Sequence, residues 1–200
     1  MNTAFYDFAK ATVRGMARVL WRARVFGAGN VPAHGALIVA CNHLSYLDPP
    51  IMGSFCPRRI SYMAKRELFE MPILGTVIRG LGAYAVDRQG SATAAIRRSL
   101  KVLEAGEAIG IFPEGTRNPD GEVQPQTGVA LLASLAQAPV VPACIMGSDR
   151  AWQLHRIEVA FGAPLSLEPG RKATREDLAK FTSEIMTAIE DLAGSIGGNT

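Results

Sequence analysis

A histidine and an aspartate stand five residues apart where the chain should leave a strand and enter a helix. His43 and Asp48 belong to the stretch CNHLSYLDPP at positions 41–50. The apolar run at 37–40 predicts a buried strand, and the two prolines after Asp48 suit the first turn of a helix that Ser45 or Asp48 could cap. A carboxylate can hold one imidazole nitrogen and leave the other as a general base. A core histidine beside a helix-capping aspartate would give the same pattern.

Two further polar clusters follow apolar, strand-like runs. Residues 109–118 read IGIFPEGTRN, and residues 83–88 read AYAVDR. In an open α/β sheet, ligands bind outside the carboxyl ends of the strands, so these exits can meet the first one at a single cleft. A base, an orienting carboxylate and two arginines suit a hydroxyl nucleophile on a phosphorylated substrate. The polar residues at these two exits are Asp87, Arg88, Glu114, Thr116 and Arg117.

These motifs resemble those of the glycerolipid acyltransferases. NHLSYLDP at 42–49 is similar to the family's His-x4-Asp block, and FPEGTR at 112–117 is similar to its third block. KRELF at 65–69, continued through Gly82 to Val86-Asp87-Arg88, resembles the second block, and VVPA at 140–143 the fourth. The four blocks occur in the family's order across about residues 25–165 of the chain.

The resemblance implies transfer of a fatty acyl group to the free hydroxyl of 1-acylglycerol 3-phosphate, giving phosphatidic acid. The donor would be acyl-CoA or acyl carrier protein, used as a substrate, with no cofactor. We expect His43 to act as general base with Asp48 fixing its tautomer, and the transfer to be direct, without an acyl-enzyme. Oxyanion donors are expected among the backbone N–H groups near the start of the helix that follows His43.

The acceptor site is expected to contain the polar residues of the second and third blocks. Guanidinium forks suit phosphate oxygens, which favours Arg88 and Arg117 as phosphate ligands. A structural salt bridge with Asp87 or Glu114 is the alternative reading of these arginines. The resemblance also assigns Glu114 and Gly115 to the acceptor site, and Thr116 lies between them and Arg117.

Two alternatives to this function remain open. The chain could be an acyltransferase of the same family with another acceptor, such as glycerol 3-phosphate, another lysolipid or a glycolipid. It could also be a catalytically silent, peripheral lipid-binding protein on the same fold. The intact His43, Asp48, Glu114 and Arg117 argue against the silent protein.

One position departs from the family pattern. Relatives commonly carry a lysine or arginine downstream of FPEGTR, shortly before a glycine that opens the next helix. This chain reads QPQTG at 124–128, and no cation occurs between Arg117 and Arg150. Gln126 therefore takes the basic position, and the acceptor should depend more strongly on Arg88 and Arg117.

Composition fits a single domain, 1–200, of a globular or membrane-associated protein. Hydrophobic residues make up 48% of the 200, enough for a sizeable core. The three cysteines, Cys41, Cys56 and Cys144, are an odd number and favour small buried hydrophobes in a reducing compartment. The three histidines are too scattered for a zinc site, so we expect no metal. No feature of the chain indicates a nucleic acid partner.

The amino-terminal segment 1–24 carries a basic, amphipathic pattern. Residues 1–66 hold nine Lys and Arg against two Asp. Lys10, Arg14, Arg18 and Arg22 recur every four residues, with apolar side chains on the opposite face. These charges exclude a transmembrane span, and no secretory signal is evident. The pattern favours an interfacial helix on an anionic membrane, placing the protein peripherally on the cytoplasmic face of the cell membrane; a helix merely packed on the domain is the alternative.

The remaining chain alternates between strand and helix patterns. This alternation predicts an α/β fold, a single layered domain with a mostly parallel sheet flanked by helices. The motif-bearing core would span 25–165, and a C-terminal helix 173–194. Strands are expected at 37–42, 60–64, 83–87, 108–112, 139–146 and 157–162, and helices at 5–24, 48–56, 68–80, 91–105, 127–137 and 173–194.

Overall fold

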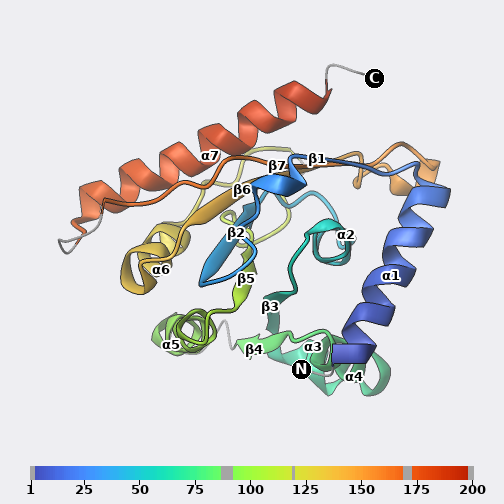
Figure 1. Cartoon of the computed structure of the whole chain (residues 1–200), viewed down its shortest axis with the longest axis horizontal. Coiled ribbons are helices and arrows are strands. Elements are labelled where there is room, and N and C mark those ends of the chain that lie inside the picture. Colours follow the sequence, from blue (N-terminus) through green and yellow to red (C-terminus); the bar gives the residue numbers. More distant parts are fainter. Residues whose placement is uncertain (1–2, 87–91, 119, 169–172, 198–200) are drawn as a thin grey trace.

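The computed structural model describes residues 3–86, 92–118, 120–168 and 173–197 (Figure 1). Its strands are β1 (Arg24–Phe26), β2 (Leu37–Cys41), β3 (Ile60–Lys65), β4 (Tyr84–Val86), β5 (Ala108–Ile111), β6 (Val140–Met146) and β7 (Glu158–Phe161). Its α-helices are α1 (Thr3–Leu20), α2 (Asp48–Phe55), α3 (Arg66–Glu70), α4 (Pro72–Gly80), α5 (Ala92–Glu104), α6 (Gly128–Ala136) and α7 (Arg175–Gly197). Two short 3-10 helices, η1 (Ala28–Asn30) and η2 (Ala151–Gln153), complete the elements.

The seven strands form one sheet in the order β1-β7-β6-β2-β5-β3-β4. Every pairing is parallel except that of β6 with β7. Strand β2 lies between β5 and β6, with Ala40 paired to Ile111 on one side and to Pro142 on the other. The carboxyl ends of β2, β5 and β6 therefore lie at one edge of the sheet, where we expected the chemistry.

Both faces of the sheet are covered by helices. All five residues of β2 are buried, as in a parallel strand packed on both sides. Its side chains alternate: Leu37, Val39 and Cys41 join a core with α1 and α2, whereas Ile38 and Ala40 join a core with α5, α6 and α7. Figure 1 shows these two sets of helices on opposite sides of the sheet.

The predicted fold class is confirmed, and three local predictions were wrong. The short strand β1 (Arg24–Phe26) was missed, because three residues carry no periodic signal. The single helix expected at 68–80 is two helices, α3 and α4, separated at Met71. Met71 precedes Pro72, and the residue before a proline disfavours the helical conformation. The first helix ends at Leu20 rather than at residue 24, and Arg22 follows with a positive φ of 47°.

Helix α1 is packed on the domain, and two residues of the basic stripe are used there. The ammonium group of Lys10 donates to the carbonyl oxygen of Cys56 at 2.5 Å, and the guanidinium of Arg14 donates to that of Ser54. Both acceptors lie at the end of α2, where unpaired carbonyls favour cations. The opposite face of α1 still exposes large apolar side chains: Phe5, Phe8, Met16, Val19 and Leu20. Within the described residues, no helix combines the length and apolar character needed to cross a bilayer.

Candidate active site

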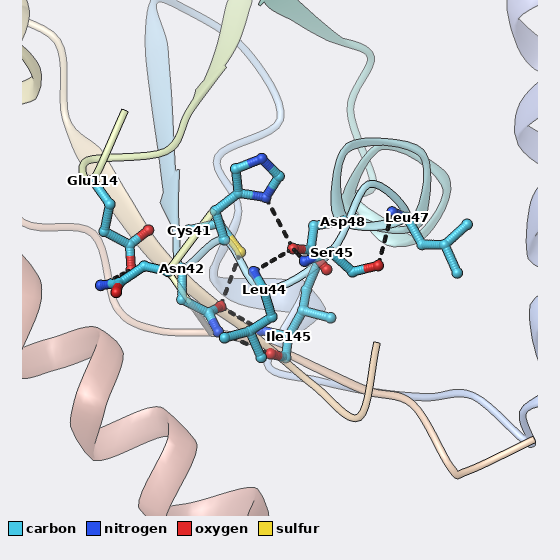
Figure 2. Close-up of polar contacts among 10 residues, drawn as sticks. Cys41, Asn42, Leu44, Ser45, Leu47, Asp48, Glu114 and Ile145 are labelled. Carbon is cyan, nitrogen blue, oxygen red and sulfur yellow. Dashed lines mark hydrogen bonds and ion pairs between the residues drawn. The ribbon is translucent and has the colours of Figure 1, made fainter. Parts of the chain in front are cut away.

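His43 and Asp48 lie side by side at the carboxyl end of β2. Nδ1 of His43 is 3.0 Å from Oδ2 of Asp48, and Figure 2 shows the aspartate at the start of α2 facing this turn. The His43 side chain is 16% exposed, whereas that of Asp48 is completely buried. A neutral imidazole that donates its Nδ1–H to the carboxylate leaves Nε2 as the acceptor. Among the described residues, Nε2 makes no hydrogen bond, so it is available to a substrate.

The buried carboxylate of Asp48 is fixed by the turn that precedes it. Its Oδ2 also accepts hydrogen bonds from the backbone N–H groups of Leu44, at 2.6 Å, and Ser45, at 2.7 Å. Neither Ser45 nor Asp48 caps α2 as expected: Asp48 is the first helical residue, and the cap position, Leu47, makes no side-chain bond. Asp48 therefore bonds backward to the turn, which sets the carboxylate orientation toward His43.

The backbone donors of this turn are largely engaged. Besides Leu44 and Ser45, the N–H of Leu47 bonds to Ser45 Oγ at 3.3 Å, and the N–H of Asp48 bonds to the Ser45 carbonyl oxygen at 3.2 Å. Four N–H groups near the start of α2 thus have intramolecular partners. The oxyanion donors expected here would have to come from other groups, or from this turn after it rearranges.

Asn42 anchors the turn to the neighbouring strand, a role that sequence reasoning missed. Its Nδ2 donates to the carbonyl oxygen of Ile145 at 2.9 Å, and its Oδ1 accepts from the Ile145 N–H at 2.8 Å (Figure 2). This pair of bonds continues the β2–β6 ladder by one side chain. The residue before His43 is therefore held in place by β6.

An aromatic ring supports the imidazole. The rings of His43 and Phe112 are stacked, with centroids 4.2 Å apart and an interplanar angle of 23°. Phe112 in turn stacks near Tyr62, with centroids 6.4 Å apart. Because Asp48 holds one edge of the imidazole and Phe112 covers one face, the ring has little rotational freedom. The remaining face and Nε2 are the parts that a substrate can reach.

The third motif forms a loop that bonds directly to the first. The backbone N–H of Asn118 donates to the carbonyl oxygen of His43 at 2.6 Å. Glu114 is buried, with 5% of its surface exposed, and its Oε1 accepts from Asn118 Nδ2 at 3.4 Å. Burial raises the pKa of Glu114, while the Asn118 hydrogen bond and the backbone N–H of His43 oppose this rise. Glu114 therefore lies beneath the loop, against the backbone of the histidine.

Arg117 reaches the first motif from the solvent side. Its guanidinium lies over the ring of Tyr46, with 3.9 Å between Cζ and the ring centroid. Arg117, Thr116 and Tyr46 are all exposed. Within the described part of the chain, Arg117 makes no ion pair, so the salt bridge with Glu114 that we considered is not formed. Asp87 and Arg88 lie outside the described residues.

Gln126 is in contact with the same loop. Its backbone N–H donates to the carbonyl oxygen of Pro113 at 2.9 Å. Gly115 has a φ of +71°, and a Cβ added there would lie 2.9 Å from Nε2 of Gln126. Glycine at position 115 thus allows both the left-handed turn and the close approach of the Gln126 amide. The position where the family resemblance led us to expect a cation is adjacent to the motif loop.

A cavity of about 620 Å³ lies behind this loop, between residues 121–127 and α7. Asn42, Glu114, Asn118 and Cys144 line it, whereas His43 does not. Burial raises the pKa of Cys144 to about 12, which keeps its thiol neutral. The volume of the cavity falls in the range of ligand sites in proteins. Glu114 both lines this cavity and contacts the backbone of His43.

Comparison with known families gives the chemistry. The family model named Acyltransferase matches residues 22–146, more than half of the chain and all of the loops just described. The chain belongs to the acyltransferase family. The resemblance drawn from the four motifs is thereby confirmed, and the chain is an acyl-transferring enzyme.

The relatives and a solved structure agree with this assignment. The chain is 29% identical over 196 residues to the 1-acyl-sn-glycerol-3-phosphate acyltransferase of Bacillus subtilis, covering 96% of this chain and 98% of that one. It is 28% identical to the enzyme of that name from Streptococcus pneumoniae, covering 78% of this chain and 60% of the relative. The crystal structure of the 1-acyl-sn-glycerophosphate acyltransferase of Thermotoga maritima superposes with a TM-score of 0.70 at 25% identity, covering 92% and 80% of the two chains.

Proposed function

We propose that this acyltransferase moves a fatty acyl group from an acyl thioester to the free hydroxyl of 1-acylglycerol 3-phosphate, giving phosphatidic acid. The observation that carries the proposal is the free Nε2 of His43, held by a buried carboxylate, with the exposed Arg117 on the adjacent loop. The names of the relatives support the acceptor. The same acceptor chemistry was expected from the sequence motifs.

The reaction follows from the geometry of the imidazole. Nε2 of His43 takes the proton of the acceptor hydroxyl as its oxygen attacks the thioester carbonyl carbon. Asp48 stabilises the imidazolium through Nδ1, as in the Ser-His-Asp arrangement, with the substrate hydroxyl in place of serine. The tetrahedral intermediate then collapses, the C–S bond breaks, and the imidazolium proton goes to the leaving thiolate. The products are the ester and a free thiol.

The acceptor phosphate would bind on the solvent side of the third motif. Arg117 presents its guanidinium there, and Arg88 would approach from the exit of β4. Gly115 and Thr116 would form the loop surface that the glycerol backbone contacts. Glu114 would support this loop from below, and it could reach the acceptor from the cavity that it lines.

The enzyme would work at the cytoplasmic face of an anionic membrane without inserting a span. Its acceptor is a lipid, and α1 exposes apolar side chains beside Arg18. The donor would be acyl-CoA or acyl carrier protein, and no cofactor or metal is required for the chemistry. Another acceptor, such as glycerol 3-phosphate, another lysolipid or a glycolipid, is the second candidate, favoured by the neutral Gln126 where the family resemblance led us to expect a cation. A catalytically silent lipid-binding protein is the least consistent with the site.

A product screen tests the proposal. Purified protein is offered a mixture of lysolipids, glycerol 3-phosphate and glycolipids with acyl-CoA or acyl carrier protein donors, and the products are identified by mass spectrometry. We expect phosphatidic acid as the main product, absent with the His43→Ala variant. A different main product would move the chain to another branch of the family, and no acylated product from any of these acceptors would refute the proposal.

A further inference from the structure

A tryptophan that the catalytic site does not use projects from the loop after β6. The side chain of Trp152, in η2, is 80% exposed, the largest value among the exposed large apolar residues of the described chain. Its neighbour Ala151 is 7% exposed. The loop is therefore folded onto the domain at Ala151 while it presents the indole ring to the outside. A tryptophan in this situation is typical of surfaces that meet an apolar phase at a polar boundary.

Leu154, two residues later, has both an unfavourable backbone conformation and an exposed apolar side chain. Its φ is +53°, a left-handed conformation that glycine or asparagine adopts more easily than leucine. Its side chain is nevertheless 56% exposed, so packing in the folded protein does not compensate for the strain. Strain of this kind at an exposed apolar residue points to a role outside the fold itself.

This loop is fastened to the end of α1. Nε1 of Trp21 donates to the carbonyl oxygen of Ala151 at 2.8 Å, and the N–H of Ile157 donates to the Trp21 carbonyl oxygen at 3.1 Å. Figure 1 shows the orange segment near residue 150 beside the carboxyl end of α1. Val19 and Leu20, in the last turn of α1, are 78% and 42% exposed. Two segments distant in sequence thus bring four exposed apolar side chains to one corner.

The charges around this corner are mostly positive. Residues 16–24 contain three arginines and no acidic residue, and residues 147–157 contain two arginines, a histidine and one aspartate. Arg18, Arg22, Arg24 and Arg150 are exposed. Asp149, the one acidic group here, lies 3.8 Å from Arg150. Apolar side chains flanked by arginines complement an anionic lipid surface, in which the rings enter the headgroup region and the guanidinium groups meet phosphates.

We propose that Val19, Leu20, Trp152 and Leu154 form a membrane-contacting rim that enters the headgroup region of an anionic bilayer. The rim lies at the same edge of the sheet as His43, because β6 ends beside β2 in a parallel pair and its exit leads into the Trp152 loop. An acceptor lipid in that bilayer then has its headgroup near the catalytic turn. The proposal rests on the proposed function for its lipid substrate and adds the second surface, distant in sequence from the bulk of α1, that holds the enzyme to the lipid.

Tryptophan fluorescence reports directly on this rim. Trp21 and Trp152 are the only tryptophans of the chain. With vesicles of phosphatidylglycerol, the Trp21→Phe variant should show a blue shift and quenching by brominated lipid chains, because only Trp152 remains. The Trp152→Phe variant should show neither to a comparable extent, since Trp21 bonds to Ala151 inside the corner. Absence of both signals from Trp152 in a folded variant that binds the vesicles would overturn the proposal and leave the rim to a protein partner.

Substitution of Leu154 separates membrane contact from folding. Leu154→Asn removes an exposed apolar side chain and relieves the positive φ, so the melting temperature should stay or rise while vesicle binding weakens by about ten-fold. Leu135→Asn is the matched control: Leu135 is 55% exposed but lies in the last turn of α6, just before β6 begins at the opposite edge of the sheet. Its variant should bind vesicles like the wild type. Equal binding by the Leu154 and Leu135 variants would overturn the proposal.

The activity assay distinguishes this proposal from the proposed function. Using a short-chain, water-soluble lysophosphatidate, the Leu154→Asn enzyme should turn over like the wild type, and it should lose activity only with the acceptor in vesicles. A wild type that binds vesicles through Trp152 but acylates neither acceptor would refute the proposed function and leave the rim intact. A wild type that acylates both acceptors, with a variant unchanged on both, would refute the rim.

Discussion

The backbone N–H of Asn118 donates to the carbonyl oxygen of His43 at 2.6 Å. Asn118 ends the FPEGTRN segment, so this segment is bonded to the backbone of the residue that we propose as general base. Asn42, the residue before His43, is fixed to β6 through its side-chain amide. The backbone around His43 is therefore held from two sides, and its ring is held by Asp48 and Phe112. The third motif thus supports the proposed base as well as carrying Arg117, which we propose as an acceptor ligand.

Replacement of the catalytic pair should abolish transfer and leave the fold. His43→Ala should lower kcat by about 10²–10⁴-fold, the usual contribution of a general base. Asp48→Asn should also lower kcat sharply, because the amide favours the wrong tautomer of the His43 imidazole. Turnover and circular dichroism of the same preparations check this. A folded His43→Ala enzyme with near-normal turnover would contradict the mechanism.

The buried carboxyl group of Glu114 should make stability depend on pH. Burial raises the pKa of Glu114, so the folded protein keeps this proton to a higher pH than the unfolded chain does. Its contribution to the free energy of unfolding is therefore present below the ordinary carboxyl pKa and is lost as pH rises through the raised value. Glu114→Gln carries no such proton. In urea unfolding, the stability of the variant relative to wild type should increase across this window; a constant difference would argue against the raised pKa.

Loss of the Arg117 guanidinium should weaken binding of the acceptor and not of the donor. A charge-assisted hydrogen bond is worth about 1.5–3 kcal/mol, so Arg117→Ala should raise the acceptor KM by about ten-fold or more and leave the donor KM nearly unchanged. Arg88→Ala is expected to act in the same direction. Tyr46→Phe is a useful control, because it keeps the ring beneath Arg117 and should change neither KM. Parallel increases in both KM values would indicate a structural role for Arg117.

A cation at position 126 should tighten the binding of a phosphate-bearing acceptor. The Gln126 side chain approaches Gly115 in the motif loop, so a lysine there can add a charge beside the loop that carries Arg117. We expect Gln126→Lys to lower the acceptor KM for lysophosphatidate. Gln126→Met, of similar length and without charge, is the control. If the lysine weakens lysophosphatidate use and a less charged acceptor is better in the wild type, the phosphatidate-forming assignment fails.

Charge reversal at two arginines of α1 should affect different properties of the protein. Arg14→Glu removes the hydrogen bonds to Ser54 at the end of α2 and places a negative charge there, so the melting temperature should fall. Arg18 is exposed, and Arg18→Glu should leave the melting temperature unchanged while weakening binding to anionic vesicles. Calorimetry and vesicle sedimentation at two salt concentrations measure both effects. Wild-type vesicle binding by Arg18→Glu would show that the charge of Arg18 does not contribute to membrane binding.

The sequence predicted the long elements because their signals are local. The apolar run of β2 and the periodic pattern of α7 fix their own conformations, and their bounds agree with the structure to within a few residues. Strand β1 exists only because Arg24 and its neighbours pair with β7. Such a strand depends on tertiary contact and has no pattern of its own to read.

The same distinction holds within the site. The proximity of His43 and Asp48 could be predicted, since a strand exit and a helix start five residues apart leave few arrangements. The contacts of Asn42 with Ile145 and of Tyr46 with Arg117 join segments about 70 to 100 residues apart, and only the sheet order brings them together. For Asn42, the one available signal was that a polar residue stands beside His43 at the exit of a strand. The sequence also could not show that Lys10 and Arg14 point toward α2. A four-residue spacing of cations is found both in helices packed on a domain and in helices that lie on a membrane.

The attachment of α1 to α2 has a mechanical consequence. Lys10 and Arg14 hold α1 to the carboxyl end of the helix whose first residue is Asp48, so the amino-terminal helix is fastened to the element that carries the partner of the proposed base. For an enzyme resting on a leaflet, the depth of α1 then sets the height of the imidazole above the lipid plane. A substitution that lets α1 sink or rise by a few ångströms would move the imidazole out of level with the free hydroxyl of a membrane-bound acceptor. Turnover of such an acceptor could thus be altered from a surface that never touches the reacting atoms.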